Sequence, residues 1–207
     1  MRSMTLKNLE LNSRVAAFTA VMVALANVLS ALSLGLTRVG QVGLDLSNIA
    51  TFVAGIYGGP YIGFLVGLLG GVVAGVNFGL LGGLGWLGLI GLPLGKSLTG
   101  LTTGALYRVF NVSRKTNRSL LTIPLVLLGY VPEFLFTIFF FIVLVPYFLG
   151  PAPWLTMGLL ISILAKAWLE TSLMSVFMGA LTGNVGFTTF VTSNLTARKA
   201  PRLINSK

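Results

Sequence analysis

The sequence LLTIPLVLLGYVPEFLFTIFFFIVLVPY, residues 120–147, is a long apolar run that contains a single charged residue, Glu133. A helix needs about 20 residues to cross the hydrocarbon core of a bilayer, at a rise of about 1.5 Å per residue. The run exceeds that length and shows no alternation of apolar and polar residues, so it predicts a membrane-spanning helix rather than a strand of a membrane β-barrel.

The rest of the chain has the same character. Of its 207 residues 55% are hydrophobic and 9% are charged, whereas soluble domains carry about 25% charged residues. Apolar segments occur at about 15–36, 42–57, 61–78, 86–107, 120–147 and 154–181. They predict an all-α membrane protein, a single domain over residues 1–207 with six transmembrane helices. The glycine-rich stretch 78–93 is expected to be an outer loop.

The basic residues predict the orientation. They gather in three short polar segments: Arg2, Lys7 and Arg14; Arg108, Arg114, Lys115 and Arg118; and Arg198, Lys199, Arg202 and Lys207. Six crossings place all three segments on one side, which the positive-inside rule makes cytoplasmic. We therefore expect a plasma-membrane protein with cytoplasmic termini and short basic tails at about 1–14 and 193–207. Membrane lipid rather than nucleic acid is the expected partner of the +10 net charge.

Residue types for catalysis are scarce. The chain has no Cys or His, which excludes thiolate and imidazole metal sites and Cys-His or Ser-His-Asp chemistry. Its only carboxylates are Glu10, Asp45, Glu133 and Glu170, and no GxxxxGK[ST] sequence occurs. We expect no enzyme activity, no metal and no cofactor.

Charged residues inside predicted spans are the main functional signal. Two lysines and two glutamates, Lys96, Glu133, Lys166 and Glu170, fall at comparable depth in the last three spans. A charge at the bilayer centre costs roughly 2.5–3.5 kcal/mol, so such groups face partners or a cavity. Two interpretations stay open. They form internal ion pairs that only fasten spans four, five and six together, or they line a pocket for a small solute, together with Asn48, Asn77, Trp86 and Trp168.

Small residues recur at helical spacing in two places. Glycines occupy every fourth position at Gly55, Gly59, Gly63, Gly67, Gly71, Gly75, Gly79 and Gly83. Such a groove lets a second helix approach closely, either within the chain or in a dimer. A shorter ladder, Ala16, Ala20 and Ala24, marks one face of the first span, for internal packing or for docking the helix of another protein.

Together these features resemble the substrate-binding S component of energy-coupling factor (ECF) vitamin transporters. The similarity rests on AAFTAVMVALA (16–26), LDLSNIATFVAGIYGGPYIGFLVGLLGGVV (44–73) and GLPLGKSLTGLTTGALYRVF (91–110). It implies a membrane subunit that binds a vitamin or related small molecule between the last three helices and the outer loops, where Lys96, Glu133, Lys166 and Glu170 match by location. It also implies that Ala16, Ala20 and Ala24 dock a transmembrane coupling subunit, while separate cytoplasmic ATPases hydrolyse ATP.

Other classes of function stay open. The chain could be a stand-alone solute transporter or channel, in which Glu133 or Glu170 relays protons or ions. A membrane assembly or lipid-modifying factor is the third class. Residue types alone leave the identity of the solute open, because two lysines suit an acceptor on the solute and two glutamates suit a donor.

Overall fold

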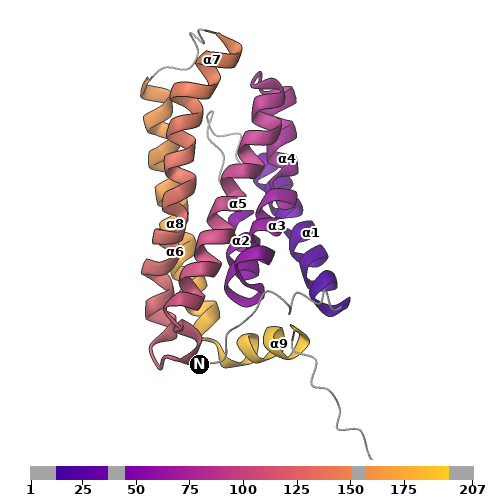
Figure 1. Ribbon diagram of the computed structural model, residues 1–207, viewed down its shortest axis with the longest axis vertical. Coiled ribbons are helices and arrows are strands. Elements are labelled where there is room, and N and C mark those ends of the chain that lie inside the picture. Colours follow the sequence, from indigo (N-terminus) through magenta and orange to yellow (C-terminus); the bar gives the residue numbers. More distant parts are fainter. Residues whose placement is uncertain (1–12, 37–44, 151–156, 196–207) are drawn as a thin grey trace, which may run out of the picture.

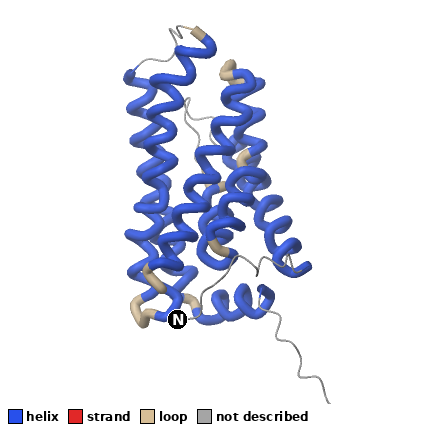
Figure 2. Tube along the Cα trace, in the orientation of Figure 1, coloured by secondary structure: helices blue, strands red, loops and turns tan. Residues whose placement is uncertain are grey.

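The computed structural model describes residues 13–36, 45–150 and 157–195, and every element within them is a helix (Figures 1 and 2). In chain order the elements are α1 (Ser13–Leu36), α2 (Asn48–Val53), η2 (Ala54–Gly58), α3 (Pro60–Gly70), α4 (Val72–Gly75), η3 (Val76–Leu81), α5 (Gly85–Val109), η4 (Val112–Arg114), α6 (Arg118–Phe139), η5 (Phe140–Leu144), α7 (Val145–Leu149), α8 (Met157–Gly183) and α9 (Val185–Leu195). The elements η2, η3 and η5 are π-helical turns, and η4 is a 3₁₀ turn.

Four helical stretches are long and apolar enough to cross a membrane: Ser13–Leu34, Pro60–Leu81, Arg118–Leu149 and Leu160–Gly183. Helix α5 matches them in length and runs beside them in the bundle (Figure 1), and Asn48–Gly58 is a shorter apolar helix. The prediction of an all-helical protein with membrane-spanning helices is confirmed at this level. Six crossings and the side of the termini stay predictions.

One expectation about the loops is wrong, and one helix was not predicted. The stretch 78–93 is mostly helical, because η3 continues to Leu81 and α5 begins at Gly85, which leaves only residues 82–84 as a turn. A further helix, α9, follows the sixth segment and lies across one end of the bundle (Figure 1). The first part of the second segment, the start of the sixth and most of both tails lie outside the described residues.

The long helices form two groups. Helices α6 and α8 pack together on one side, and α1, α3 and α5 pack on the other, with α5 also in contact with α6 (Figure 1). The start of α1, the end of α5, the start of α6 and all of α9 lie at the same end of the bundle (Figure 1). Helix α2 fills the space between the groups near that end.

The glycine ladder joins α3, α4 and η3 to α5. A Cβ added at Gly67 would lie 2.5 Å from the Lys96 carbonyl oxygen, and one at Gly71 would lie 2.8 Å from the Cα of Pro93. Side chains are absent where two backbones touch, which is the use of small residues in membrane helix packing. Packing within the chain, one of the two interpretations of this ladder, is confirmed.

A side-chain amide repairs the break between α3 and α4. Asn27 of α1 donates from Nδ2 to the Leu69 carbonyl (3.0 Å) and accepts from the Val73 N–H at Oδ1 (3.1 Å). Leu69 and Val73 are four residues apart, so the amide takes the place of one hydrogen bond of an ideal helix. Asn27 therefore bridges the break and holds α1 against the α3–α4 stretch.

Candidate functional site

A cavity of about 400 Å³ lies between the two groups of helices. Its lining comes from α1, from segment 45–48, from α4 and η3, from α5, from α6 with η5, and from α8. The lining includes polar, charged, aromatic and small side chains: Ser33, Asp45, Asn48, Phe78, Lys96, Tyr130, Glu133, Phe141, Lys166, Ala167 and Glu170. The volume falls in the range of small-molecule sites, roughly 300–1,000 Å³.

Apolar clusters lie on both sides of the cavity along the bundle. Toward α9, residues of α2, α6 and α8 pack closely, with Phe52, Val126 and Met178 all 0% exposed. Toward the opposite end, a second cluster includes Leu84, Phe140 and Leu160. Phe141 belongs to that second cluster and also lines the cavity. The charged side chains of the cavity therefore lie between two apolar clusters.

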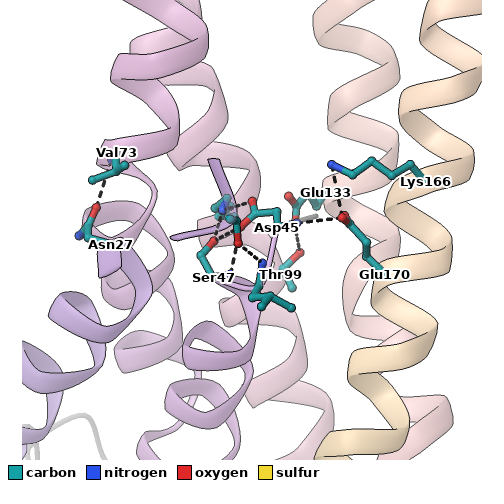
Figure 3. A network of polar contacts seen from close by, with 11 residues as sticks. Asn27, Asp45, Ser47, Val73, Thr99, Glu133, Lys166 and Glu170 are labelled. Atoms are coloured by element: carbon teal, nitrogen blue, oxygen red, sulfur yellow. Dashed lines mark hydrogen bonds and ion pairs between the residues drawn. The ribbon is translucent and has the colours of Figure 1, made fainter. Parts of the chain in front are cut away.

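Lys96 is committed to the segment that precedes α2. Its ammonium group bonds Asp45 Oδ2 (2.5 Å) and the hydroxyl of Ser47, and Lys96 is 5% exposed. Asp45 Oδ1 also accepts the Ser47 N–H (3.0 Å) and hydroxyl (2.6 Å). These bonds fold segment 45–47 into a compact polar turn against α5 (Figure 3).

The same turn is bonded to α1 and α8. The Asp45 N–H donates to Glu170 Oε1 (2.8 Å), and the Leu46 N–H donates to the Ser33 hydroxyl (3.1 Å). Glu170 in turn pairs with Lys166 one turn earlier on α8, at 3.3 Å between Nζ and Oε1. Figure 3 shows Asp45 between Ser47 on one side and Glu170 on the other. Segment 45–47 thus connects three helices at the level of the cavity.

Glu133 differs from the other charged groups. Its Oε2 accepts a hydrogen bond from the Thr99 hydroxyl, and among the described residues no lysine or arginine forms a salt bridge with it. The side chain lines the cavity, as does Asn48, whose buried Oδ1 has no hydrogen-bond donor in the described part of the chain. Glu133 and Asn48 therefore each carry an acceptor oxygen without a donor among the described residues.

The structure brings five of the eight proposed solute-binding residues to the cavity: Asn48, Lys96, Glu133, Lys166 and Glu170. The other three lie elsewhere. Trp168 packs edge-on against Tyr130 and Phe134 between α6 and α8, with ring centroids 5.5 and 5.6 Å apart.

The remaining two residues are Trp86 and Asn77. Trp86 is 51% exposed and contacts Phe148, and Asn77 is half-buried in η3; neither lines the cavity. The sequence locates a tryptophan or asparagine along a helix, but the direction of its side chain depends on how the helix is rotated about its axis.

The expected ion pairs have different partners. The interpretation that ion pairs fasten spans four, five and six to each other is wrong. Lys96 bonds Asp45 in the segment before α2, and Lys166 pairs with Glu170 within its own helix. Asp45 is the main residue that the sequence interpretation left out of the site. Its charge inside the predicted span 42–57 was visible, but its distance in sequence from Lys96 hid the contact. Ser33 and Tyr130 carried no comparable signal.

The alanine ladder faces outward. Ala16, Ala20 and Ala24 are all exposed, beside the exposed apolar residues Val21 and Val28. Only 11% of the most apolar part of α1 is buried, whereas 28–39% of the corresponding part is buried in the other three candidate spans. Internal packing of this ladder is therefore excluded, and the face is available to lipid or to another helix.

The described residues hold no group of three His, Cys, Asp or Glu side chains that could bind a metal ion. Comparisons with protein-family models, curated proteins and solved structures match nothing to this chain. The geometry of the cavity and of the α1 face is therefore the basis for a functional assignment.

Proposed function

We propose that the chain is the substrate-binding membrane subunit of an ECF-type importer. It crosses the plasma membrane six times with both termini in the cytoplasm, binds a vitamin or related small molecule from the outer side, and delivers it inward. A transmembrane coupling subunit and cytoplasmic ATPases act as its partners.

The cavity is the observation that carries this proposal. A protein with no metal-binding cluster in its described part still builds a chamber of about 400 Å³ with five Asp, Glu and Lys side chains in the described part of its wall. Charged groups in a membrane helix are costly and usually mark a substrate path. Packing alone would be served as well by apolar residues, since replacing a buried pair with them is often neutral or stabilising.

The exposed alanine face of α1 supports the proposal of a transmembrane coupling subunit as partner. A smooth exposed alanine stripe lets a foreign helix approach closely, and membrane helices associate through such surfaces. The basic residues Arg108, Arg114 and Arg118 belong to the end of the bundle that also carries α9 (Figure 1). The positive-inside rule makes that end cytoplasmic, near the ATPases.

The packed layers of the bundle support a mechanism in which the subunit moves as a body. Between the cavity and the α9 end lie Phe52, Val126 and Met178, which leave no accessible surface. A solute in the cavity would not pass this layer while the helices keep their packing. Reorientation of the whole subunit, driven by the partner ATPases, delivers the solute without dismantling the core.

Substitution of Ala20 tests the docking face. Ala20→Trp is expected to abolish ATP-dependent uptake in cells that supply the coupling subunit and ATPases, while solute binding by the purified subunit is unchanged. Ala180→Trp is the matched control, because Ala180 is an exposed alanine on α8. Uptake by Ala20→Trp at the control's rate would show that the face does not dock a partner.

One observation favours the alternative, a stand-alone proton- or ion-coupled transporter. Glu133 faces the cavity without a cationic side chain in salt-bridge contact among the described residues, as a proton relay would. The two proposals differ in their energy source. Uptake that stops when the proton gradient is collapsed, with ATP maintained, would favour the alternative.

A further inference from the structure

Among the described residues, the charges of the cavity wall do not cancel. Asp45, Glu133 and Glu170 oppose Lys96 and Lys166, so with all five ionised the wall carries one excess negative charge. The two lysines are each paired with a carboxylate, at 2.5 Å for Lys96 and 3.3 Å for Lys166. The excess charge therefore belongs to Glu133.

Both lysines are already paired with carboxylates, so neither brings uncompensated positive charge to an anionic solute. Lys96 is buried, and two of its three N–H donors are taken by Asp45 and Ser47. Lys166 pairs with Glu170, the same carboxylate that holds the Asp45 N–H. An anion that drew Lys166 away would leave a buried carboxylate unpaired, which is strongly unfavourable.

Two groups of the wall are acceptors that lack a donor in the described part of the chain. Glu133 Oε1 has no partner among the described residues, and Asn48 Oδ1 is buried and lacks a donor. Unpaired buried acceptors are unfavourable until a donor reaches them. A solute that carries N–H donors satisfies both.

The aromatic part of the wall suits a planar cation. Tyr130 is 3% exposed, lines the cavity, and makes a T-shaped ring contact with Trp168. Phe78 and Phe141, from the π-helical turns η3 and η5, contribute further apolar surface. Aromatic rings attract cations that lie over their faces.

From these contacts we infer that the solute is a small planar organic cation whose N–H donors bind Glu133 and Asn48. This inference rests on the proposed function, because it describes what the same cavity binds. Of the two possibilities that the sequence left open, it favours a donor on the solute for the glutamates over an acceptor for the lysines.

Three probes of one shape separate the possibilities: benzamidine, benzamide and benzoate, which carry a positive, no and a negative charge on the same ring. Each is titrated against the purified full-length protein in detergent, with binding read from thermal stability and confirmed by calorimetry. Benzamidine is expected to bind best. Glu133→Gln, which keeps the shape and removes the charge, should weaken its binding roughly 10- to 100-fold, the loss of one charge-assisted hydrogen bond.

Two further variants keep the result interpretable. Glu133→Asp retains the carboxylate and should retain the preference for benzamidine, which guards against a Gln variant that folds poorly. Glu10→Gln makes the same chemical change in the sequence that precedes α1 and should leave binding unchanged.

Several results would overturn the inference: benzoate binding more tightly than benzamidine, benzamide binding equally well, undiminished benzamidine binding by Glu133→Gln, or no binding of benzamidine. The first two leave the proposed function intact, since the cavity would still bind a solute of another charge. Failure of the proposed function has a different signature, namely uptake that does not need the coupling subunit and ATPases, whatever the charge of the solute.

Discussion

The ion pair between Lys96 and Asp45 should be worth more to the fold than an ordinary surface pair. Removing one member of a buried pair costs about 3–5 kcal/mol, because the other charge is left without compensation. The two members are not equally buried: their side chains are 6% and 31% exposed, respectively. The two single substitutions should therefore have unequal effects.

Asp45→Leu should be the more damaging change, at about 5 kcal/mol of unfolding free energy, near the top of that range. It leaves the buried Lys96 ammonium with only the Ser47 hydroxyl and removes the acceptor of the Ser47 N–H. Lys96→Met should cost about 3 kcal/mol, because the remaining carboxylate faces the cavity and keeps both bonds from Ser47.

The double variant supplies the control. Lys96→Met with Asp45→Leu replaces the pair by apolar groups, and such replacements are often neutral, so we expect it to unfold within about 2 kcal/mol of wild type. Unfolding free energies can be measured by titration with sodium dodecyl sulfate in mixed micelles, with helix content as the signal. Losses that simply add in the double variant, or single variants within about 0.5 kcal/mol of wild type, would refute the assigned pairing.

Two other substitutions test the packing that shapes the cavity. Asn27→Leu should lower the unfolding free energy by about 2–4 kcal/mol, because the Leu69 carbonyl and the Val73 N–H each lose a partner at the α3–α4 break; an unchanged value in the same titration would show that the amide is dispensable. Gly67→Ala should destabilise by about 1–3 kcal/mol, since its Cβ would meet the backbone of α5 at 2.5 Å. Gly95→Ala is the matched control: its Cβ would lie 3.4 Å from Phe136, an ordinary contact, so helix propensity should leave stability equal or up to about 1 kcal/mol higher. Equal losses at the two glycines would contradict the close α3–α5 contact.

Helix content and most helix positions could be predicted from the sequence, because apolar length and glycine spacing are local signals. Residues 120–147 and the ladder through Gly67 and Gly71 illustrate this: one becomes the stretch Arg118–Leu149, and the other becomes the contact with α5. The π-helical turns and α9 had no such signal. A π-helical turn differs from the α-helix by one residue in its hydrogen bonding, which apolar patterns do not report.

The site was harder to predict, because it depends on contacts between distant segments. Charge inside an apolar run located Lys96, Glu133 and Glu170 near the cavity, but pairing could not follow from spacing alone. The Lys96–Asp45 bond spans 51 residues, and the Asp45–Glu170 bond spans 125. The position of Trp168 could not be predicted for the same reason. It packs against Tyr130 and does not line the cavity itself.

The central claim is that the cavity holds a small solute, and the most direct test is mass spectrometry of molecules released from gently purified protein. Ala167→Phe adds a ring to a residue that lines the cavity, whereas Ala165→Phe places the same ring on the exposed face of the same helix. We predict one compound bound near one-to-one by wild type and Ala165→Phe and absent from Ala167→Phe. No bound compound in wild type, or a compound retained equally by Ala167→Phe, would contradict the claim.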